Sequence, residues 1–269
     1  MMALLSGCAA RPEAPILQAP GNDTAQISTR LETLLPTDVL ILGEQHDAVE
    51  HQTIEQEVVT ALAAKGVLAA VALEMADTGA STSTLRPSAT EQQVRNALKW
   101  NDKGWPWVAY GPAVMTAVRA GVPVLGANLP RAQMPASMAD SQLDARLPGP
   151  ALKAQQQLIR TGHCNLLPES QITPMTRIQI AKDITMANTL AQAALPGKTV
   201  LLLAGSGHAD RQLGVPQHLP ADLKAKAVRL RAGGVGNEQP EVFDAVWTTP
   251  ALPEKDYCAG LEKRLAPKP

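Results

Sequence analysis

Aromatic residues are the scarcest part of this chain, which has one Phe, two Tyr and four Trp among 269 residues. A site that needs a phenol therefore has only Tyr110 and Tyr257 available. An excess of either charge is also missing, since 24 Lys and Arg face 25 Asp and Glu. Because no basic patch is present, we expect no nucleic-acid partner.

Long hydrophobic runs are lacking as well. No stretch approaches the roughly 20 apolar residues that a membrane-spanning helix needs. The length suits one large α/β domain or two small ones, and no clear boundary or internal repeat divides it. We therefore expect a tether and lead-in over residues 9–35 and a single domain over residues 36–269.

Cysteine is rare, with three residues, and the first lies in Leu5-Ser6-Gly7-Cys8. This stretch has the form of a bacterial lipobox, in which the cysteine is lipidated and becomes the mature N-terminus. The apolar segment before it is shorter than the usual 7–15 residues, so residues 1–8 are interpreted as a truncated lipoprotein signal. The alternative is a chance cysteine near a terminus. A lipobox predicts a lipid-anchored protein of the bacterial cell envelope.

Export would place the other two cysteines in an oxidising compartment. Cys164 and Cys258 form an even pair once Cys8 is acylated. We predict a disulfide between them that ties the C-terminal tail to the middle of the chain. Two free buried thiols are the alternative.

Two apolar runs, residues 39–42 and 199–204, each lead into Gly-x-x-His, at Gly43 to His46 and at Gly205 to His208. Runs of this kind suit strands that are buried on both faces. A third run, residues 67–75, carries Glu74 near its end. Polar residues at the carboxyl ends of parallel strands meet at one edge of an open α/β sheet. We expect Glu44, His46, Glu74 and His208 to form one site there; for Glu74 a solvated carboxylate at a helix start is the alternative.

Strands and helices alternate along most of the chain. Further strands are expected at residues 122–127, 227–230 and 242–247, and helices at residues 47–65, 112–120, 148–160 and 173–194. This alternation predicts an α/β fold with a mostly parallel central sheet and helices on both faces. Residues 132–195 lack a strand run, and we interpret them as a helical insertion that forms a lid over the sheet edge.

Three of the four Trp and one of the two Tyr fall in residues 100–112. This clustering predicts either a local hydrophobic mini-core or the wall of an apolar pocket, and the two are compatible. Arg131 follows the strand expected at residues 122–127. It could hold a carboxylate in a bidentate pair, or it could form a structural ion pair. His163 either reaches the site or only flanks the disulfide.

The four residues expected at the sheet edge allow two kinds of chemistry. Imidazole and carboxylate groups are ordinary ligands of a divalent metal ion, which would activate water at an open position. Without a metal, a His–Glu pair could act as a general base in ester hydrolysis. No Gly-x-Ser-x-Gly nucleophile motif is present. A third possibility is that the cluster only holds the strand ends together.

Five motifs in their order along the chain resemble the ChaN-type haem-binding uptake lipoproteins. They are Ile41 to His46, Leu73-Glu74-Met75, Asn128 to Arg131, His163-Cys164 and Gly205 to Ala209. The resemblance implies haem as ligand, a role in bacterial iron acquisition, and a homodimer formed around haem. It agrees with the lipobox and with a place at the outer membrane facing the periplasm, where an outer-membrane haem receptor would be a partner.

More distantly, the paired Gly-x-x-His motifs are similar to those of the Tiki and TraB group and of erythromycin esterases, which implies a hydrolase ancestry. The hydrolase alternative would use Glu44, His46, Glu74 and His208. For haem, we expect Tyr110 to bind the iron, because a ferric ion favours a deprotonated phenol. His46, His163 and His208 are the other candidate ligands, with Met as a further possibility, and Arg131 or a lysine such as Lys103 is the candidate for the propionates.

Overall fold

The computed structural model describes residues 24–234 and 242–262 of the chain. The lipobox cysteine Cys8 and the part of the expected tether over residues 9–23 lie outside the described residues. No helix in the described ranges is long and apolar enough to cross a membrane.

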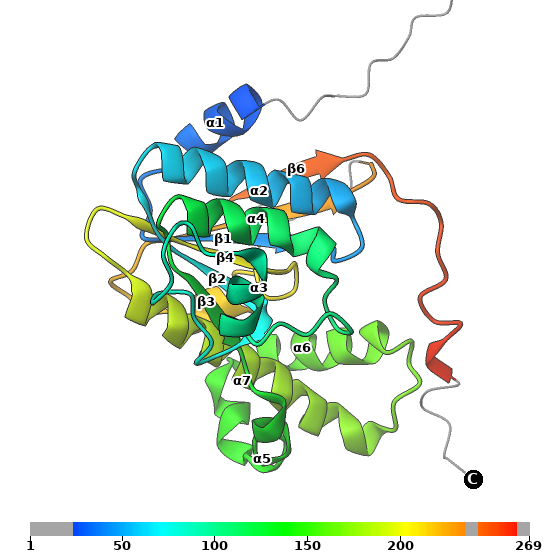
Figure 1. Ribbon diagram of the computed structural model, residues 1–269. Coiled ribbons are helices and arrows are strands. Elements are labelled where there is room, and N and C mark those ends of the chain that lie inside the picture. The colour runs from blue at the N-terminus through cyan, green and yellow to red at the C-terminus, as the bar shows by residue number, and fades with distance from the viewer. Residues whose placement is uncertain (1–23, 235–241, 263–269) are drawn as a thin grey trace, which may run out of the picture.

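A six-stranded sheet with parallel pairings forms the centre of the protein, in the order β3-β2-β4-β1-β5-β6 (Figure 1). Its strands are β1 (Val39–Glu44), β2 (Leu68–Asp77), β3 (Val124–Asn128), β4 (Thr199–Gly205), β5 (Ala225–Ala232) and β6 (Ala245–Thr249). All six expected strands are present. The sequence prediction of an α/β fold with a mostly parallel sheet is confirmed.

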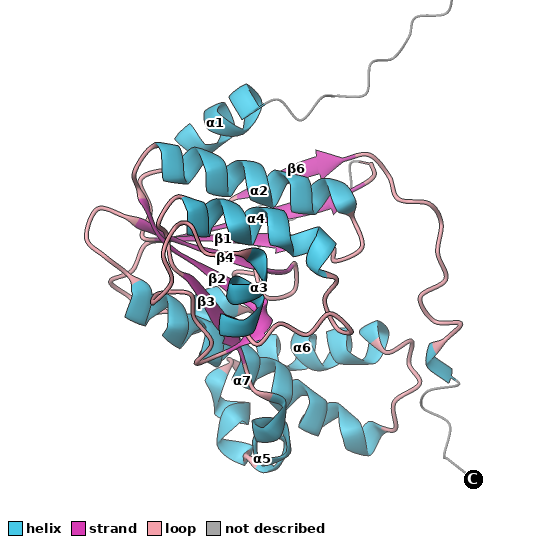
Figure 2. Ribbon diagram, viewed as in Figure 1, coloured by secondary structure: helices cyan, strands magenta, loops and turns pink. Residues whose placement is uncertain are grey.

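Helices connect these strands, as Figure 2 shows. The α-helices are α1 (Thr24–Glu32), α2 (Val49–Ala64), α3 (Glu91–Ala97), α4 (Trp107–Arg119), α5 (Met134–Ala139), α6 (Gly149–Gly162) and α7 (Glu169–Ala193). The part of the chain that the structure describes also has three short 3-10 helices, η1 (Arg131–Gln133), η2 (Ser141–Arg146) and η3 (Val215–His218). Local sequence explains several boundaries: Thr90 and Gln93 form a capping box at the start of α3, and Gly66, with φ +69°, follows α2 in the left-handed conformation.

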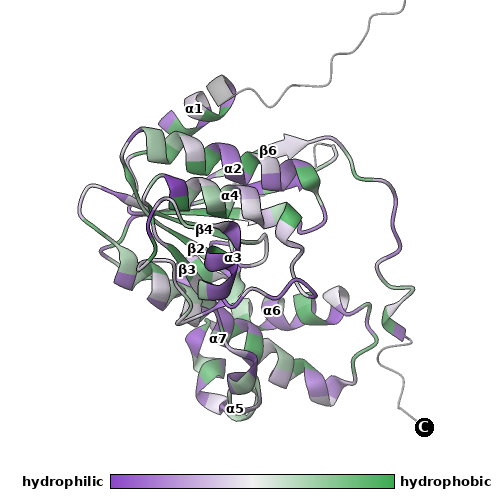
Figure 3. Ribbon diagram, viewed as in Figure 1, coloured by the Kyte–Doolittle hydropathy of each residue, from purple (hydrophilic) through white to green (hydrophobic). Residues whose placement is uncertain are grey.

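The two faces of the sheet are buried under different helices because neighbouring strand residues point to opposite sides. Leu40 and Leu42 face a core that includes residues of α1, α2 and α4. Val39 and Ile41 face a second core, which α7 covers with Met186, Ala187 and Leu190. Figure 3 shows the central strands as the most continuously hydrophobic part of the ribbon.

The expected helical insertion consists of η1, α5, η2, α6 and α7. The C-terminal half of α7 packs on the sheet itself, through Met186 and Leu190. The N-terminal half of α7 contacts α5 and α6, which lie beyond the sheet (Figure 1). The insertion is therefore only partly a lid, because half of its longest helix covers one face of the sheet.

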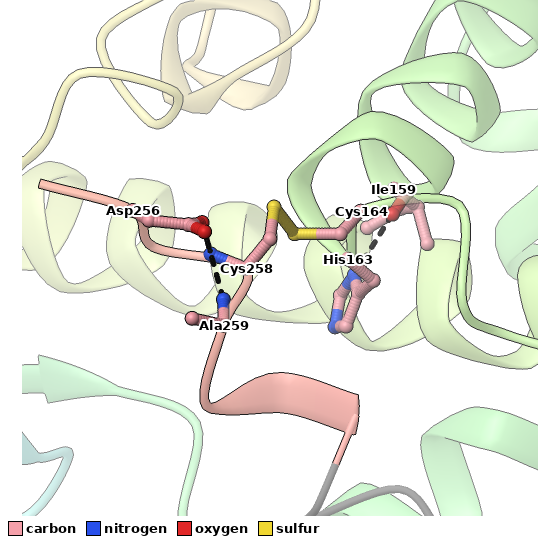
Figure 4. The surroundings of a disulfide bond; sticks show 6 residues. All are labelled: Ile159, His163, Cys164, Asp256, Cys258 and Ala259. Carbon is pink, nitrogen blue, oxygen red and sulfur yellow. Dashed lines mark hydrogen bonds between the residues drawn. A yellow bond between two sulfur atoms is a disulfide. The ribbon is translucent and has the colours of Figure 1, made fainter.

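The predicted disulfide is present and joins Cys164, directly after α6, to Cys258 near the end of the described chain. Cys164 and Asn165 both have positive φ angles, of 58° and 57°. Two successive left-handed residues turn the chain sharply at the end of α6 and present the Cys164 sulfur to the C-terminal segment. Figure 4 shows the bridge and its neighbours.

Candidate functional site

The carboxyl ends of β1, β2 and β4 lie side by side in the sheet, as expected, and they bring together Glu44, His46, Glu74 and His208. These residues line a cavity of about 800 Å³. The cavity is also lined by residues from β5, from the end of α6, from α7 and from the C-terminal segment, namely Arg229, Leu230, Arg231, Gly162, Gln179 and Tyr257. The predicted convergence of the two Gly-x-x-His motifs at one sheet edge is present in the structure.

Glu44 is buried and accepts three hydrogen bonds. Its Oε1 accepts from the hydroxyl of Tyr110 at 2.8 Å and lies 2.7 Å from Nδ1 of His46, and its Oε2 accepts from Nε2 of Gln52 at 2.5 Å. Three donors surround this one carboxylate and satisfy both of its oxygens. Glu44 therefore acts as an anchor that orients the His46 ring.

His46 is the more exposed of the two histidines that line the cavity, with 38% of its side chain exposed against 7% for His208. Because Nδ1 donates to Glu44, the other ring nitrogen, Nε2, points toward Glu74, whose Oε2 is 3.8 Å away. Burial lowers the pKa of His46, but the hydrogen bond to Glu44 and the charge of Glu74 outweigh burial and raise it. The ring also makes an edge-to-face contact with Trp105, with centroids 4.8 Å apart.

Gly205 makes room for this ring at the end of β4. A Cβ atom at position 205 would lie 2.9 Å from Nε2 of His46, which is closer than such atoms approach in proteins. The backbone N–H of Gly205 donates to Oε2 of Glu74 at 2.9 Å. Glycine at this position thus allows the two motifs to pack against each other, because any larger residue would displace the imidazole.

His208 has a different environment, since both of its ring nitrogens face carboxylates. Nδ1 lies 2.5 Å from Asp183 and Nε2 lies 3.2 Å from Glu74. Burial lowers the pKa of His208, but the charges of Glu74 and Asp183 outweigh it and raise the pKa to about 10. His208 is therefore a buried imidazolium at neutral pH, which leaves it no lone pair for a metal, for haem iron or for a proton.

Glu74 is the acid that connects the two histidines. Burial would raise its pKa, but the charge of His208, a hydrogen bond from His208 and the charge of Lys182 bring it far below the usual value. Lys182 Nζ lies 3.5 Å from Oε1 of Glu74. Glu74 is therefore a buried carboxylate and not the solvated acid that the sequence left open.

The predicted divalent metal site has no support in this geometry. Within residues 24–234 and 242–262, no group of three or more His, Cys, Asp or Glu side chains is arranged to hold a metal ion. The reason lies in the contacts above: Glu44 is saturated by three donors, and His208 uses both nitrogens on acids.

Tyr110, the residue expected to bind haem iron, is 1% exposed and donates to Glu44. Burial and the neighbouring Glu44 charge raise its pKa well above the ordinary value. A phenol that is buried and resists ionisation does not have the properties of an iron ligand. Its ring instead packs with Trp100 and Trp105, so the aromatic span forms the predicted mini-core and touches the site through Trp105.

The other two candidates lie at the edge of the site or away from it. Arg131 is exposed in η1 and is not among the residues that line the cavity. His163 follows α6 next to Cys164, and its Nδ1 donates to the carbonyl of Ile159 at 2.8 Å (Figure 4). This bond fixes the tautomer that leaves Nε2 of His163 as an acceptor. Its neighbour Gly162 lines the cavity.

Sequence reasoning missed Asp183, Gln52 and Glu55, three buried polar side chains around the site. Asp183 lies between Ile180 and Ala187 on the buried face of α7, so its place in the helical periodicity was a usable signal. Gln52 and Glu55 occupy the buried face of α2 in the same way. Tyr257, Arg229 and Arg231 could not be placed from local pattern, because distant segments bring them to the cavity.

Comparison with known proteins gives a consistent result. The family model described as "Haem-binding uptake, Tiki superfamily, ChaN" matches residues 30–219. Among solved structures, one that describes cofacial haem binding to ChaN of Campylobacter jejuni is similar with a TM-score of 0.67 and 27% identity, over 81% of this chain and 89% of that chain. The structure of the type III effector HopBA1 is similar with a TM-score of 0.48 and 15% identity, over 87% of this chain and 97% of that chain. This similarity is too weak to bear on function. No curated protein sequence matches.

Proposed function

Because the chain belongs to the haem-binding uptake family of the Tiki superfamily that includes ChaN, we propose that it is an envelope lipoprotein that holds haem during bacterial haem and iron uptake. The observation that carries this proposal is the cavity at the sheet edge, which coincides with the family motifs around His46 and His208. Haem would supply an iron ion that a protein side chain could ligate.

The cavity fits haem in size and offers partners for its iron and its propionates. Its volume of about 800 Å³ lies within the roughly 300–1,000 Å³ common for cofactor pockets. Tyr257 and His46 present a phenol oxygen and an imidazole ring on its wall, and Leu230 adds apolar surface. Arg229 and Arg231 line the same wall, and their guanidinium groups suit the two propionates. We therefore propose these two arginines, rather than Arg131, for the propionates.

A homodimer is the second part of the proposal. Polar side chains make up most of the cavity lining, whereas the faces of a porphyrin are largely apolar. Apolar area that one subunit leaves uncovered would be buried by a second subunit, at about 25 cal/mol per Å². Cofacial haem binding is described for ChaN of C. jejuni. Light scattering should show the mass doubling when haemin is added, and a monomer at saturation would refute the dimer.

The third part concerns location, and it rests on the lipobox at Cys8. We propose that lipidated Cys8 anchors the protein in the outer membrane, facing the periplasm, where an outer-membrane haem receptor passes haem to it. Labelled fatty acid should enter the protein and should fail to enter the Cys8→Ser variant. Label in the variant would contradict the anchor.

Haemin titration of the full chain carrying Cys8→Ser tests the central proposal. A saturable shift of the Soret band at one haem per chain or fewer is expected. Metal analysis of the same preparation tests the competing site. If haemin does not bind saturably and the preparation contains one zinc, cobalt or manganese ion per chain, the proposal is wrong and the ligand of the site is a divalent metal ion.

A metal-free hydrolase is the second candidate, and one observation favours it. Glu44 orients His46 through Nδ1, and the imidazole lines the cavity, which is the arrangement of a general base with its orienting acid. In this case His46→Ala should abolish ester or peptide hydrolysis while the melting temperature stays close to that of the unaltered chain. Inactivity of the unaltered chain on broad ester and peptide panels would exclude the candidate.

A further inference from the structure

A second cavity, of about 750 Å³, lies on the helices that cover one face of the sheet. Residues of α2, α3 and the loop before α4 form its sides, and α4 runs along its length. We call it the α4 groove, and on α4 it is lined by Trp107, Val108, Gly111, Pro112, Met115 and Arg119. None of its residues lines the cavity at the sheet edge, so the α4 groove is separate from the candidate site.

The floor of the α4 groove is apolar. Trp107 and Met115 are nearly buried, whereas Val108 stands on the rim with 84% of its surface exposed. A Cβ atom at Gly111 would lie 2.5 Å from Nε1 of Trp107, so glycine is what allows the indole ring to lie against α4. An exposed valine beside an indole is apolar surface that a partner could bury.

Three polar groups of the α4 groove have no partner within residues 24–234 and 242–262. The indole N–H of Trp107 donates to no acceptor there, and its nitrogen is not one of the enclosed polar atoms, so a ligand can reach it. Pro112 has no N–H to offer to the carbonyl of Val108, four residues earlier in the helix. Arg119 forms no ion pair, whereas Arg95 is paired with Asp102.

These features suit a peptide in the polyproline II conformation. Such a peptide has no internal hydrogen bonds, so its carbonyl groups are open to donors such as an indole N–H. Proline-rich segments of the P-x-x-P type characteristically bind to grooves lined by aromatic side chains. Arg119 adds a preference for an acidic residue in the peptide.

The chain itself contains a segment of this type. Residues 12–15, Pro12-Glu13-Ala14-Pro15, have the P-x-x-P pattern with an acid inside it, and Ile16 and Leu17 follow. In the polyproline II conformation, residues 12–17 would extend about 19 Å, at about 3.1 Å per residue. The 13 residues of α4 extend about 20 Å, so the segment matches the groove in length as well as in charge.

The segment can also reach the α4 groove. The described chain begins in α1, which packs on α2, and α2 packs on α4 (Figure 1). Neighbouring helix axes lie about 8–10 Å apart, so two such steps separate α1 from α4. Residues 18–23 can span up to about 20 Å when they are extended, which covers this distance.

We infer that residues 12–17 dock in the α4 groove in the polyproline II conformation, with Glu13 at Arg119 and the indole N–H of Trp107 donating to a backbone carbonyl of the segment. The inference goes beyond the proposed function and requires neither haem nor a lipid. Docking would leave only residues 9–11 between the α4 groove and Cys8. An anchor at Cys8 would then hold the α4 side of the protein toward the membrane and leave the cavity at the sheet edge uncovered.

The test uses the full chain produced without lipidation and with its disulfide closed, so that Cys8 is the one free thiol of the three cysteines. A nitroxide attached to Cys8 should broaden the NMR signal of the Met115 methyl group. The methyl signals of Leu158, an exposed residue of α6, should be broadened much less. Equal broadening of Met115 and Leu158 would show that the segment does not dock, and the inference would be wrong.

Charge reversal tests the assigned contact. Glu13→Lys and Arg119→Glu should each reduce the broadening of Met115 about two- to fivefold, as expected for one exposed ion pair, and the double variant should restore it. Glu32→Lys, at an exposed acid of α1, is the matched control and should change nothing. A double variant that stays as low as the single variants would overturn the pairing of Glu13 with Arg119.

The indole N–H signal of Trp107, assigned with Trp107→Phe, provides a second measurement. Pro12→Ala/Pro15→Ala should shift this signal toward that of a solvent-exposed indole, because the substituted segment is no longer held in the polyproline II conformation. An unchanged signal would mean that the indole donates to no carbonyl of the segment, contrary to the inference.

A second copy of the chain is the competing occupant of the α4 groove. Chains that carry the nitroxide can be mixed with isotope-labelled chains that lack it, and Met115 of the latter should keep its signal intensity. Broadening of Met115 in the mixture would mean that the groove binds the segment of another copy, and docking within one chain would be refuted.

Discussion

Glu55 on α2 provides the sharpest test of the electrostatics beside the site. The side chain is fully buried, and neither carboxyl oxygen has a hydrogen-bond partner among the described residues. Burial raises the pKa of Glu55 well above its ordinary value of 4.5, and the charge of Glu44 raises it further. Glu55 is therefore a neutral acid in the folded protein over a pH range in which the unfolded chain carries it ionised.

The sign of the effect follows from proton binding. Because the pKa of Glu55 is higher in the folded protein, unfolding releases a proton. The contribution of Glu55 to the free energy of unfolding is therefore fully present below pH 4.5 and is lost as the pH rises toward the folded pKa. The free energy of unfolding should fall by about 1.4 kcal/mol per pH unit in that range. Glu55→Gln replaces the neutral acid by a neutral amide of similar size and removes this loss.

We therefore expect Glu55→Gln to match the unaltered chain near pH 4.5 and to become increasingly more stable at higher pH. Urea unfolding at pH 5, 6 and 7 would measure the difference in the free energy of unfolding. In thermal unfolding at the same pH values, the gap in melting temperature should widen by about 3–6 °C per pH unit. Glu91→Gln, at an exposed acid on α3, is the matched control and should show little change. A difference between Glu55→Gln and the unaltered chain that is independent of pH would refute the reasoning.

Two further predictions concern the contacts of the paired motifs. Gly205→Ala should lower the free energy of unfolding by about 1–3 kcal/mol and shift the His46 imidazole signals in NMR spectra, because the new Cβ would lie 2.9 Å from Nε2; Gly207→Ala, where a Cβ has nothing within 4 Å, should change neither. Asp183→Asn should cost about 1.5–3 kcal/mol in urea unfolding at pH 7 because it leaves the buried His208 cation with one carboxylate; an unchanged midpoint would mean that His208 is neutral.

Much of the fold could be predicted because the sheet is all parallel. Its strands are buried on both faces, so β1 and β4 stand out as continuous apolar runs, and only their ends carry polar residues. The same property predicted which side chains converge, since parallel strands end at one edge. The short helices at this edge were harder to predict from the sequence. α5 has no buried residue, so its sequence shows no helical repeat of apolar residues.

The burial of Tyr110 could not be predicted, for a physical reason. Its aromatic surroundings favour a core and a pocket wall equally, and the difference depends on Glu44, which lies 66 residues earlier in the chain. Tyr257 was not predicted at the site, yet it lines the cavity next to Cys258, which a disulfide joins to Cys164. A residue beside a long-range crosslink takes its surroundings from the partner segment, and local sequence cannot describe them.

The two Gly-x-x-His motifs show why equal sequence patterns need not give equal chemistry. β4 lies between β2 and β1, and α7 covers the adjoining face of the sheet. His208 therefore lies between Glu74 and Asp183, and a carboxylate faces each of its ring nitrogens. His46 follows β1, and one of its nitrogens is held by Glu44 while the ring remains 38% exposed at the cavity. The structural histidine fixes Glu74 in place as a carboxylate, and that carboxylate in turn sets the electrostatic environment of His46. A ligand in the cavity can therefore reach His46 more readily than His208, whose side chain is only 7% exposed.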